Sequence, residues 1–99
     1  MLLFNPIKIK NLELKNRLVM PAMATNFADE GGFVTPRLID YYEARAKGGV
    51  GLIIVEGAIV DPRGKIFRNN LCLYDEEHIP GLKRLTQAIH TYGAKAAIQ

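Results

Sequence analysis

Hydrophobic and polar positions alternate over short stretches of this chain. In residues 7–14, "IKIKNLEL", apolar side chains occupy every second position in two runs separated by a polar pair. This pattern predicts a small β-hairpin with one covered face. Residues 50–57 form a nearly continuous apolar run rich in β-branched residues, which is typical of a strand buried on both faces. Residues 17–20 and 95–99 are predicted to be two further strands.

Two longer segments show the period of a helix instead. Apolar residues recur every three or four positions in residues 36–47 and again in residues 79–92, which indicates two amphipathic helices. Thr35 and Pro36 favour a helix start, because the hydroxyl can accept a hydrogen bond from a free backbone N–H and proline fits the first turn. Acidic residues 75–77 suit the start of the second helix, where the helix dipole favours negative charge. Glycines directly after each segment predict the helix ends.

The predicted order is hairpin, strand, helix, strand, helix, strand. Such alternation is typical of right-handed βαβ units in a parallel sheet. Two architectures share this order. A doubly wound sheet usually carries a glycine fingerprint after its first strand, and none follows Met20. An eight-stranded (β/α)8 barrel typically needs about 250 residues, so a chain of 99 residues would hold only the start of one, with about three strands.

Composition and charge narrow the classes of function. The net charge is +3, the 13 Lys and Arg residues are spread along the chain, and the densest basic group is Arg63, Lys65 and Arg68. We therefore expect no nucleic-acid partner, and a solvated loop rather than a phosphate contact at these three residues. The single cysteine, Cys72, is expected to be partly buried, and it cannot form an internal disulfide, which fits a reducing compartment. With no signal sequence and no apolar stretch long enough for a membrane span, a cytoplasmic location is expected.

Candidate chemistry lies where the predicted parallel strands end. In both architectures ligands bind at the carboxyl ends of the strands, which here are followed by residues 21–25, residues 56–58 and Gln99. Proline, alanine and glycine let the backbone approach a flat ligand, and the amide of Gln99 can donate and accept hydrogen bonds. This combination suits a planar heteroaromatic ring. The alternative is that the small residues only form tight turns and Gln99 only begins a loop.

Three stretches of the sequence carry a more specific signal. The segments "LFNPIKIKNLELKNRLVMPAM", "YYEARAKGGVGLIIVEGAIVDPRGK" and "DEEHIPGLKRLTQAIHTYGAKAAIQ" resemble the amino-terminal part of the Old Yellow Enzyme family of flavin-dependent oxidoreductases. The "PAMATN" version is most similar to the branch of bacterial 2,4-dienoyl-CoA reductase, NADH oxidase and enoate reductases. The resemblance implies an FMN-binding (β/α)8 TIM barrel whose bottom is plugged by the hairpin of residues 7–14. Residues 1–99 would be the amino-terminal part of that one domain.

The resemblance also implies roles for named residues. Cofactor-binding residues around the isoalloxazine ring would be Pro21, Ala22, Met23, Ala24, Gly57 and Gln99, with Gln99 at the pyrimidine end. Thr25 and Asn26 would lie on the substrate side. Many relatives have threonine or cysteine at the position of Ala24, where the side chain adjusts the flavin potential, and alanine cannot do so by hydrogen bonding.

The implied activity is transfer of hydride from NAD(P)H through FMN to the C=C bond of an α,β-unsaturated carbonyl or enoyl compound. In the family, the residues that polarise the carbonyl, supply the proton and hold the FMN phosphate come from later strands, so no catalytic residue is expected in this chain. The iron–sulfur cluster of the most similar branch also needs cysteines further on. By itself the chain is expected to retain little FMN and to show no turnover.

Two other hypotheses compete with this one. A different FMN barrel, such as a dihydroorotate dehydrogenase-like enzyme, is disfavoured by the hairpin and the "PAM" opening. The second is a non-catalytic barrel fragment or interaction module, which would pair through its open sheet edge with a second copy or with a complementary chain.

Three titratable residues have structural interpretations. Glu56 is expected to be ion-paired, with Arg17 or Arg45 as its partner. His78 and His90 are twelve residues apart, so they do not share a helix face for zinc. We expect surface or helix-capping roles for both histidines and no metal site.

Overall fold

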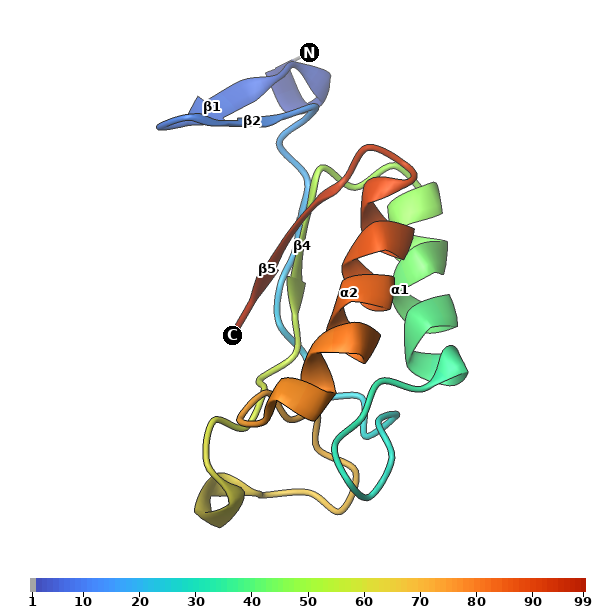
Figure 1. Cartoon of the computed structure of the whole chain (residues 1–99). Helices are drawn as coiled ribbons and strands as arrows, with labels where there is room; N and C mark the ends of the chain where they lie inside the picture. The colour runs from blue at the N-terminus through green and yellow to red at the C-terminus, as the bar shows by residue number, and fades with distance from the viewer. Residues whose placement is uncertain (1) are drawn as a thin grey trace.

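The alternation predicted from the sequence is present in the computed structural model, which describes residues 2–99 (Figure 1). The elements, in chain order, are the 3-10 turn η1 (Leu2–Phe4), strands β1 (Ile7–Ile9), β2 (Leu12–Leu14) and β3 (Val19–Met20), helix α1 (Pro36–Lys47), strand β4 (Leu52–Val55), the 3-10 turns η2 (Pro62–Gly64) and η3 (Glu76–His78), helix α2 (Ile79–His90) and strand β5 (Lys95–Ile98). The strands of the sheet are shorter than the apolar runs that predict them, because backbone pairing stops where the chain turns into a loop.

The strands β3, β4 and β5 form a parallel sheet with β4 in the centre. The register aligns Met20 with Ile53 and Ile53 with Ala96. Both helices lie on one face of this sheet, and the antiparallel β1–β2 hairpin lies at the end where the parallel strands begin (Figure 1). The loops that follow β3 and β4 therefore gather at the opposite end of the sheet.

The core lies between the sheet and the two helices. It is built from side chains that the two periodicities place on the facing surfaces, namely Leu38, Tyr42, Ala46, Ile53, Val55, Leu85 and Ile89. The other face of β4, which carries Leu52 and Ile54, is only half-buried. The sequence predicts a strand buried on both faces, but in this chain only the face of β4 towards the helices is fully buried.

The start of α1 follows the predicted signal, whereas the start of α2 differs from the prediction. Thr35 Oγ1 accepts a hydrogen bond from Leu38 N (3.1 Å) and donates one to Phe27 O (2.5 Å). The predicted cap of α1 is thus confirmed, and it also ties the helix to the loop after β3. The acidic residues before α2 form the separate turn η3, in which Asp75 accepts a hydrogen bond from Glu77 N (3.1 Å). Asp75 therefore caps η3, and α2 itself begins later, at Ile79.

The hairpin is covered at one end only. Ile7 pairs with Leu14 and Ile9 pairs with Leu12, so the four apolar side chains share a face as predicted. Leu14 is 1% exposed, whereas Ile9 is 53% exposed. The predicted covered face is therefore covered near Leu14 and open to solvent at the turn.

Candidate functional site

A cavity of about 340 Å³ opens at the carboxyl ends of the parallel strands. Its lining comes from the loop after β3, the loop after β4 and the residue after β5, and consists of Ala24, Gly57, Ala58, Ile59, Ile66, Phe67, Asn70 and Gln99. These side chains are small or apolar apart from two carboxamides. The place and the lining are those of a ligand site in a parallel α/β structure.

Gly57 and Gln99 lie side by side at the ends of β4 and β5. Gln99 N donates a hydrogen bond to Val55 O (3.2 Å), and Ala58 N donates one to Gln99 O (3.0 Å). A Cβ atom added to Gly57 would lie 3.3 Å from Gln99 Oε1. These bonds fix the backbone of Gln99 at the cavity wall, and the lack of a side chain at Gly57 leaves space beside the amide of Gln99.

The four residues that directly follow β3 do not all line the cavity. Ala24 lines the cavity, whereas Pro21, Ala22 and Met23 are not part of its lining. Met23 is 47% exposed, so its side chain is free of the core of the described chain. A contact of these three residues with a cofactor stays a prediction.

Thr25 and Asn26 make hydrogen bonds that shape the loop after β3. Asn26 adopts a left-handed backbone conformation with φ of +62°, and its Oδ1 accepts a hydrogen bond from Asn69 N (2.9 Å). Thr25 Oγ1 accepts a hydrogen bond from Phe27 N (3.1 Å) and donates one to Glu56 Oε1 (2.8 Å). Neither residue lines the cavity. Their predicted place on the substrate side stays a prediction.

Glu56 is buried, but its partners differ from those predicted. The side chain is 1% exposed, and within residues 2–99 no ion pair joins it to Arg17 or Arg45. Its Oε1 accepts hydrogen bonds from Thr25 Oγ1 (2.8 Å) and from the Tyr42 hydroxyl (3.0 Å). The Tyr42 hydroxyl also accepts a hydrogen bond from Glu56 N (2.9 Å). The predicted ion pair is wrong, because two hydroxyl groups reach the carboxylate in this fold.

Burial changes the acid–base behaviour of Tyr42. Its side chain is fully buried between α1 and the sheet. Burial is the main cause that raises the pKa of its hydroxyl; the hydrogen bond from the Glu56 N–H acts in the opposite direction, and the charge of Glu56 raises the pKa further. The hydroxyl therefore stays neutral and keeps the proton that it donates to Glu56. Helical spacing alone places Tyr42 on the core face, but no spacing in the sequence signals its contact with Glu56.

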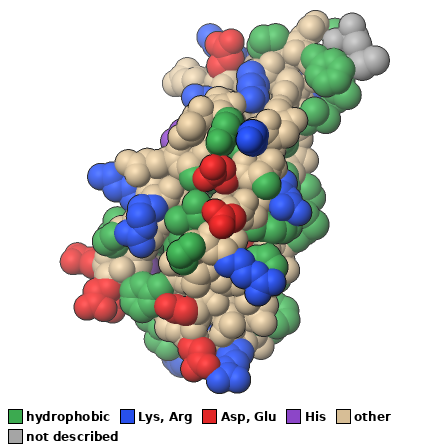
Figure 2. Space-filling model, turned by 90° about the vertical axis from the view of Figure 1, so that its right-hand side faces the viewer, with side chains coloured by type: hydrophobic (Ala, Val, Ile, Leu, Met, Phe, Trp, Pro, Cys, Tyr) green, Lys and Arg blue, Asp and Glu red, His purple; other side chains and the backbone are tan. Residues whose placement is uncertain are grey.

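The basic residues of the loop after β4 have partners within the chain. Arg63 pairs with Asp61 (2.9 Å), and its guanidinium lowers the pKa of that carboxyl. Arg68 pairs with Glu30, and Lys65 Nζ donates a hydrogen bond to Glu30 O (2.6 Å). On the face shown in Figure 2, Lys and Arg side chains lie among acidic and apolar ones and do not gather in a patch. These contacts agree with the predicted solvated loop.

His78 and Cys72 are both buried. His78 is 3% exposed, packs against the rings of Phe33 and Tyr74, and contacts Gly31 O through its Nε2 at 3.0 Å. The surface role predicted for this histidine is therefore wrong, and although His78 stands at the N-cap position of α2, its side chain makes no capping hydrogen bond. Cys72 is 2% exposed, which is more complete burial than the partial burial predicted, and this burial raises the pKa of its thiol.

Residues 2–99 contain neither a group of metal-ligating side chains nor a helix suited to a membrane. No cluster of three or more His, Cys, Asp or Glu side chains there could hold a metal ion. No helix in the described part of the chain is both long enough and apolar enough to cross a membrane.

Comparison with known sequences decides the family. A family model for the NADH:flavin oxidoreductase / NADH oxidase family matches residues 2–99. The chain belongs to this family. An NADH oxidase from Thermoanaerobacter brockii is 53% identical over 98 residues, and an NADPH dehydrogenase from Halalkalibacterium halodurans is 45% identical over 98 residues. The match covers 98% of this chain in each case, but only 15% and 29% of the two relatives.

Two solved structures share the fold of this chain. A complex of 2-naphthoyl-CoA reductase with 2-naphthoyl-CoA matches 99% of this chain with a TM-score of 0.96 and 40% identity, and the match covers 15% of that structure. Old Yellow Enzyme from Pichia sp. AKU4542 matches 99% with a TM-score of 0.91 and 30% identity, over 25% of its chain. The chain therefore has the fold of the amino-terminal portion of the Old Yellow Enzyme barrel, an antiparallel hairpin followed by three parallel strands. The predicted resemblance and fold class are confirmed.

The cavity suits the ring of the flavin that the family name implies. A flavin ring is flat and has hydrogen-bonding groups along one edge. Ala24, Gly57 and Ala58 offer small surfaces for its plane, and the amide of Gln99 offers a donor and an acceptor for its edge. Any side chain at position 57 would occupy this space, as the short distance to Gln99 shows. None of the residues that line this cavity is basic, so the lining offers no cationic side chain for a phosphate.

Proposed function

We propose that the protein containing this chain is an FMN-dependent oxidoreductase of the ene-reductase type. It would pass hydride from NAD(P)H to the C=C bond of an α,β-unsaturated carbonyl or enoyl compound. The observation that supports this most directly is the cavity that Ala24, Gly57 and Gln99 line together at the strand ends. FMN bound there would supply the hydride chemistry. The similar 2-naphthoyl-CoA reductase complex supports including thioesters among the substrates.

The role of this chain in the proposed enzyme is to hold the ring. Ala24 and Gly57 keep the wall of the cavity free of bulk. The amide of Gln99 can donate a hydrogen bond to the pyrimidine edge, where a donor stabilises negative charge. Pro21, Ala22 and Met23 would extend the wall, and Thr25 and Asn26 would lie towards the substrate. The proton donor and the phosphate site would come from other parts of the barrel.

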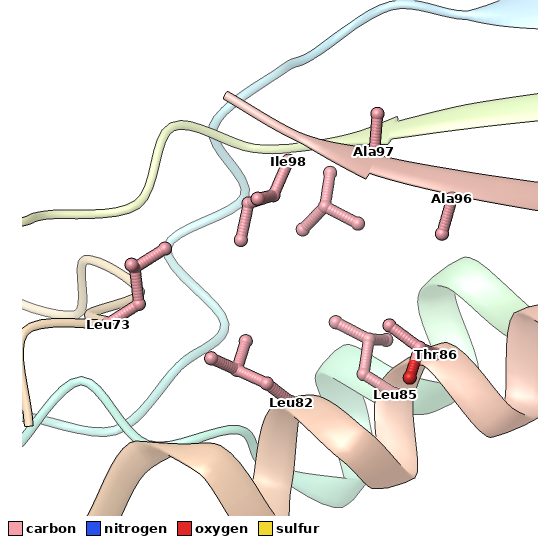
Figure 3. A pocket seen from close by; sticks show the side chains of 8 residues that line it. Leu73, Leu82, Leu85, Thr86, Ala96, Ala97 and Ile98 are labelled. Carbon is pink, nitrogen blue, oxygen red and sulfur yellow. The ribbon is translucent and has the colours of Figure 1, made fainter. Parts of the chain in front are cut away.

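We also propose that residues 1–99 form the amino-terminal part of one (β/α)8 domain. The chain spans 15% and 29% of the two curated relatives described above, and its sheet has three of the eight strands of such a barrel. The strand β5 is an edge strand, and Figure 3 shows the side chains that surround a hollow between it and α2. The volume of this apolar hollow is about 300 Å³. The hollow is lined by Val55, Leu73, Leu82, Leu85, Thr86, Ala96, Ala97 and Ile98. A further βα unit beside β5 would pair its free edge and cover this hollow.

The flavin content of the purified whole protein, of which this chain is a part, tests the proposed function. Ala24→Leu places a larger side chain in the cavity, whereas Ala44→Leu makes the same change on an exposed position of α1. We expect the wild-type protein and Ala44→Leu to bind FMN stoichiometrically and to oxidise NADPH with 2-cyclohexen-1-one as acceptor. Ala24→Leu should lose both properties. A wild-type protein that takes up no FMN, or equal FMN binding by the two variants, would contradict the proposal.

Residues 1–99 expressed alone test the proposed domain. Because no basic residue lines the cavity, we expect this piece to quench little FMN fluorescence on titration and to show no turnover. A gel-filtration mass well above one chain, without bound flavin, would instead favour association through the open edge of β5. A stoichiometric FMN complex with NAD(P)H oxidation would show that the piece is a complete flavin site.

A further inference from the structure

Glu56 lies between the cavity and the core, and the proposed chemistry does not use it. It directly precedes Gly57, which lines the cavity, and it is 1% exposed. Burying a carboxylate is costly unless hydrogen-bond donors replace the lost water. Within residues 2–99 no ion pair compensates it, and two hydroxyl groups from distant parts of the chain, those of Thr25 and Tyr42, donate hydrogen bonds to it.

The direction of these hydrogen bonds is determined by their surroundings. Thr25 Oγ1 already accepts a hydrogen bond from Phe27 N, and the Tyr42 hydroxyl already accepts one from Glu56 N. Each hydroxyl proton is therefore free to point at Glu56 Oε1, at distances of 2.8 and 3.0 Å. Hydrogen bonds of this kind to a carboxylate are among the stronger ones in proteins.

The bond from Thr25 connects two walls of the cavity. Thr25 directly follows Ala24, which forms the wall that comes from β3, and Glu56 directly precedes Gly57, which forms the wall that comes from β4. Tyr42 holds Glu56 at both its backbone N–H and its carboxylate, so the orientation of the side chain is set from α1. The spacing of Ala24 and Gly57 thus depends on a contact made behind the cavity surface.

We propose that Glu56 is a positioning residue that holds Thr25, and with it the wall formed by Ala24, at the spacing from Gly57 that the FMN ring requires. This inference rests on the proposed function, because it assumes that the ring binds between these walls. It assigns Glu56 no contact with the reacting atoms. Its expected signature is a change in flavin binding and in the flavin spectrum, beyond any change in stability.

Three variants of the whole protein test the contact. Thr25→Val keeps the shape of the side chain and removes the hydroxyl, whereas Thr25→Ser keeps the hydroxyl. We expect Thr25→Val to weaken FMN binding about tenfold, as loss of a hydrogen bond to a charged group should, and to shift the visible absorbance of bound flavin. Thr25→Ser should restore both. Ile89→Val, a change of a buried core residue in the last turn of α2, should lower the melting temperature and leave FMN binding unchanged.

A double-mutant cycle separates the contact with Glu56 from the contact with Phe27. In a Glu56→Met background, Thr25→Val should weaken FMN binding no further, because the acceptor is already gone. Independent, additive effects, or wild-type affinity and spectrum in Thr25→Val, would overturn the inference. A wild-type protein that binds no FMN would instead overturn the proposed function. The two failures are therefore distinguishable in one series of titrations.

Discussion

Replacing Tyr42 by phenylalanine removes a single oxygen atom that makes two hydrogen bonds to one residue. The hydroxyl donates to Glu56 Oε1 (3.0 Å) and accepts from Glu56 N (2.9 Å). Tyr42 is 0% exposed and Glu56 is 1% exposed, so water cannot replace the lost oxygen without entering the core. The neighbouring Tyr41 offers a matched control, because it is half-buried and contacts Phe27, Tyr42 and Arg45 through its ring.

The size of the effect follows from these contacts. A hydrogen bond to a charged group contributes about 1.5–3 kcal/mol, and a buried N–H left without a partner costs about 1–3 kcal/mol. We therefore expect Tyr42→Phe to lower the free energy of unfolding by about 3 kcal/mol. Tyr41→Phe, which keeps its ring contacts, should lower it by about 0.5 kcal/mol or less. A loss of about 3 kcal/mol is a large part of the total of about 5–15 kcal/mol typical of a folded domain.

Urea unfolding followed by far-UV circular dichroism would measure both variants. The slope of the free energy against urea should be the same for the wild type and the two variants, so that the midpoints compare stability directly. If Tyr42→Phe and Tyr41→Phe destabilise the protein equally, the two hydrogen bonds to Glu56 contribute nothing measurable. That result would refute the role of Tyr42 in holding Glu56 in place.

Other predictions concern pH, a close backbone approach and the thiol. Because burial raises the pKa of Tyr42 above its unfolded value of about 10, the stability that Tyr42 contributes is complete below pH about 10 and falls at higher pH. The difference in unfolding free energy between wild type and Tyr42→Phe should therefore shrink above that pH, by at most about 1.4 kcal/mol per pH unit; a constant difference would contradict this. Gly32 has φ of +82°, and a Cβ there would lie 2.2 Å from Cys72 Sγ, whereas Gly49 has φ of +107° and open space around it. In thermal unfolding we expect Gly32→Ala to cost about 3 kcal/mol or more and Gly49→Ala about 1 kcal/mol, and equal losses would count against the contact with Cys72. The Cys72 thiol is 2% exposed and its pKa is raised by burial, so iodoacetamide should modify it at least about 100-fold more slowly in the native than in the unfolded protein. Rapid alkylation of the native protein would show that the thiol is accessible.

Much of the fold can be predicted because it depends on local pattern. The alternation in residues 7–14 and the helical period of residues 36–47 act over a few neighbouring residues, and both elements are present with those limits or close to them. The signal at Thr35 is also local, since its side chain caps the helix that begins one residue later. The start of α2 was harder to predict, because acidic residues favour any helical turn and the structure uses them in η3.

The candidate site could be predicted in part for the same reason. Ala24, Gly57 and Gln99 stand out in the sequence because each lies at or shortly after the carboxyl end of a predicted parallel strand, and parallel strands bring their carboxyl ends to one edge. The structure places all three at one cavity. Pro21, Ala22 and Met23 lie outside that lining. The composition of residues 21–24 does not show which of these small or flexible residues line the cavity.

The sequence by itself determined the order of elements and the edge of the sheet where a ligand would bind. Both depend on the periodicity and the direction of successive segments, which can be read from neighbouring residues along the chain. Only the tertiary structure decided the partners of Glu56. A charged residue in the sequence suggests an opposite charge as partner, but burial requires donors at hydrogen-bonding distance, and the packing of α1 against β4 places the Tyr42 hydroxyl there. The contact with Thr25 arises from the parallel pairing of β3 and β4, which brings residues 31 apart in sequence together behind the cavity.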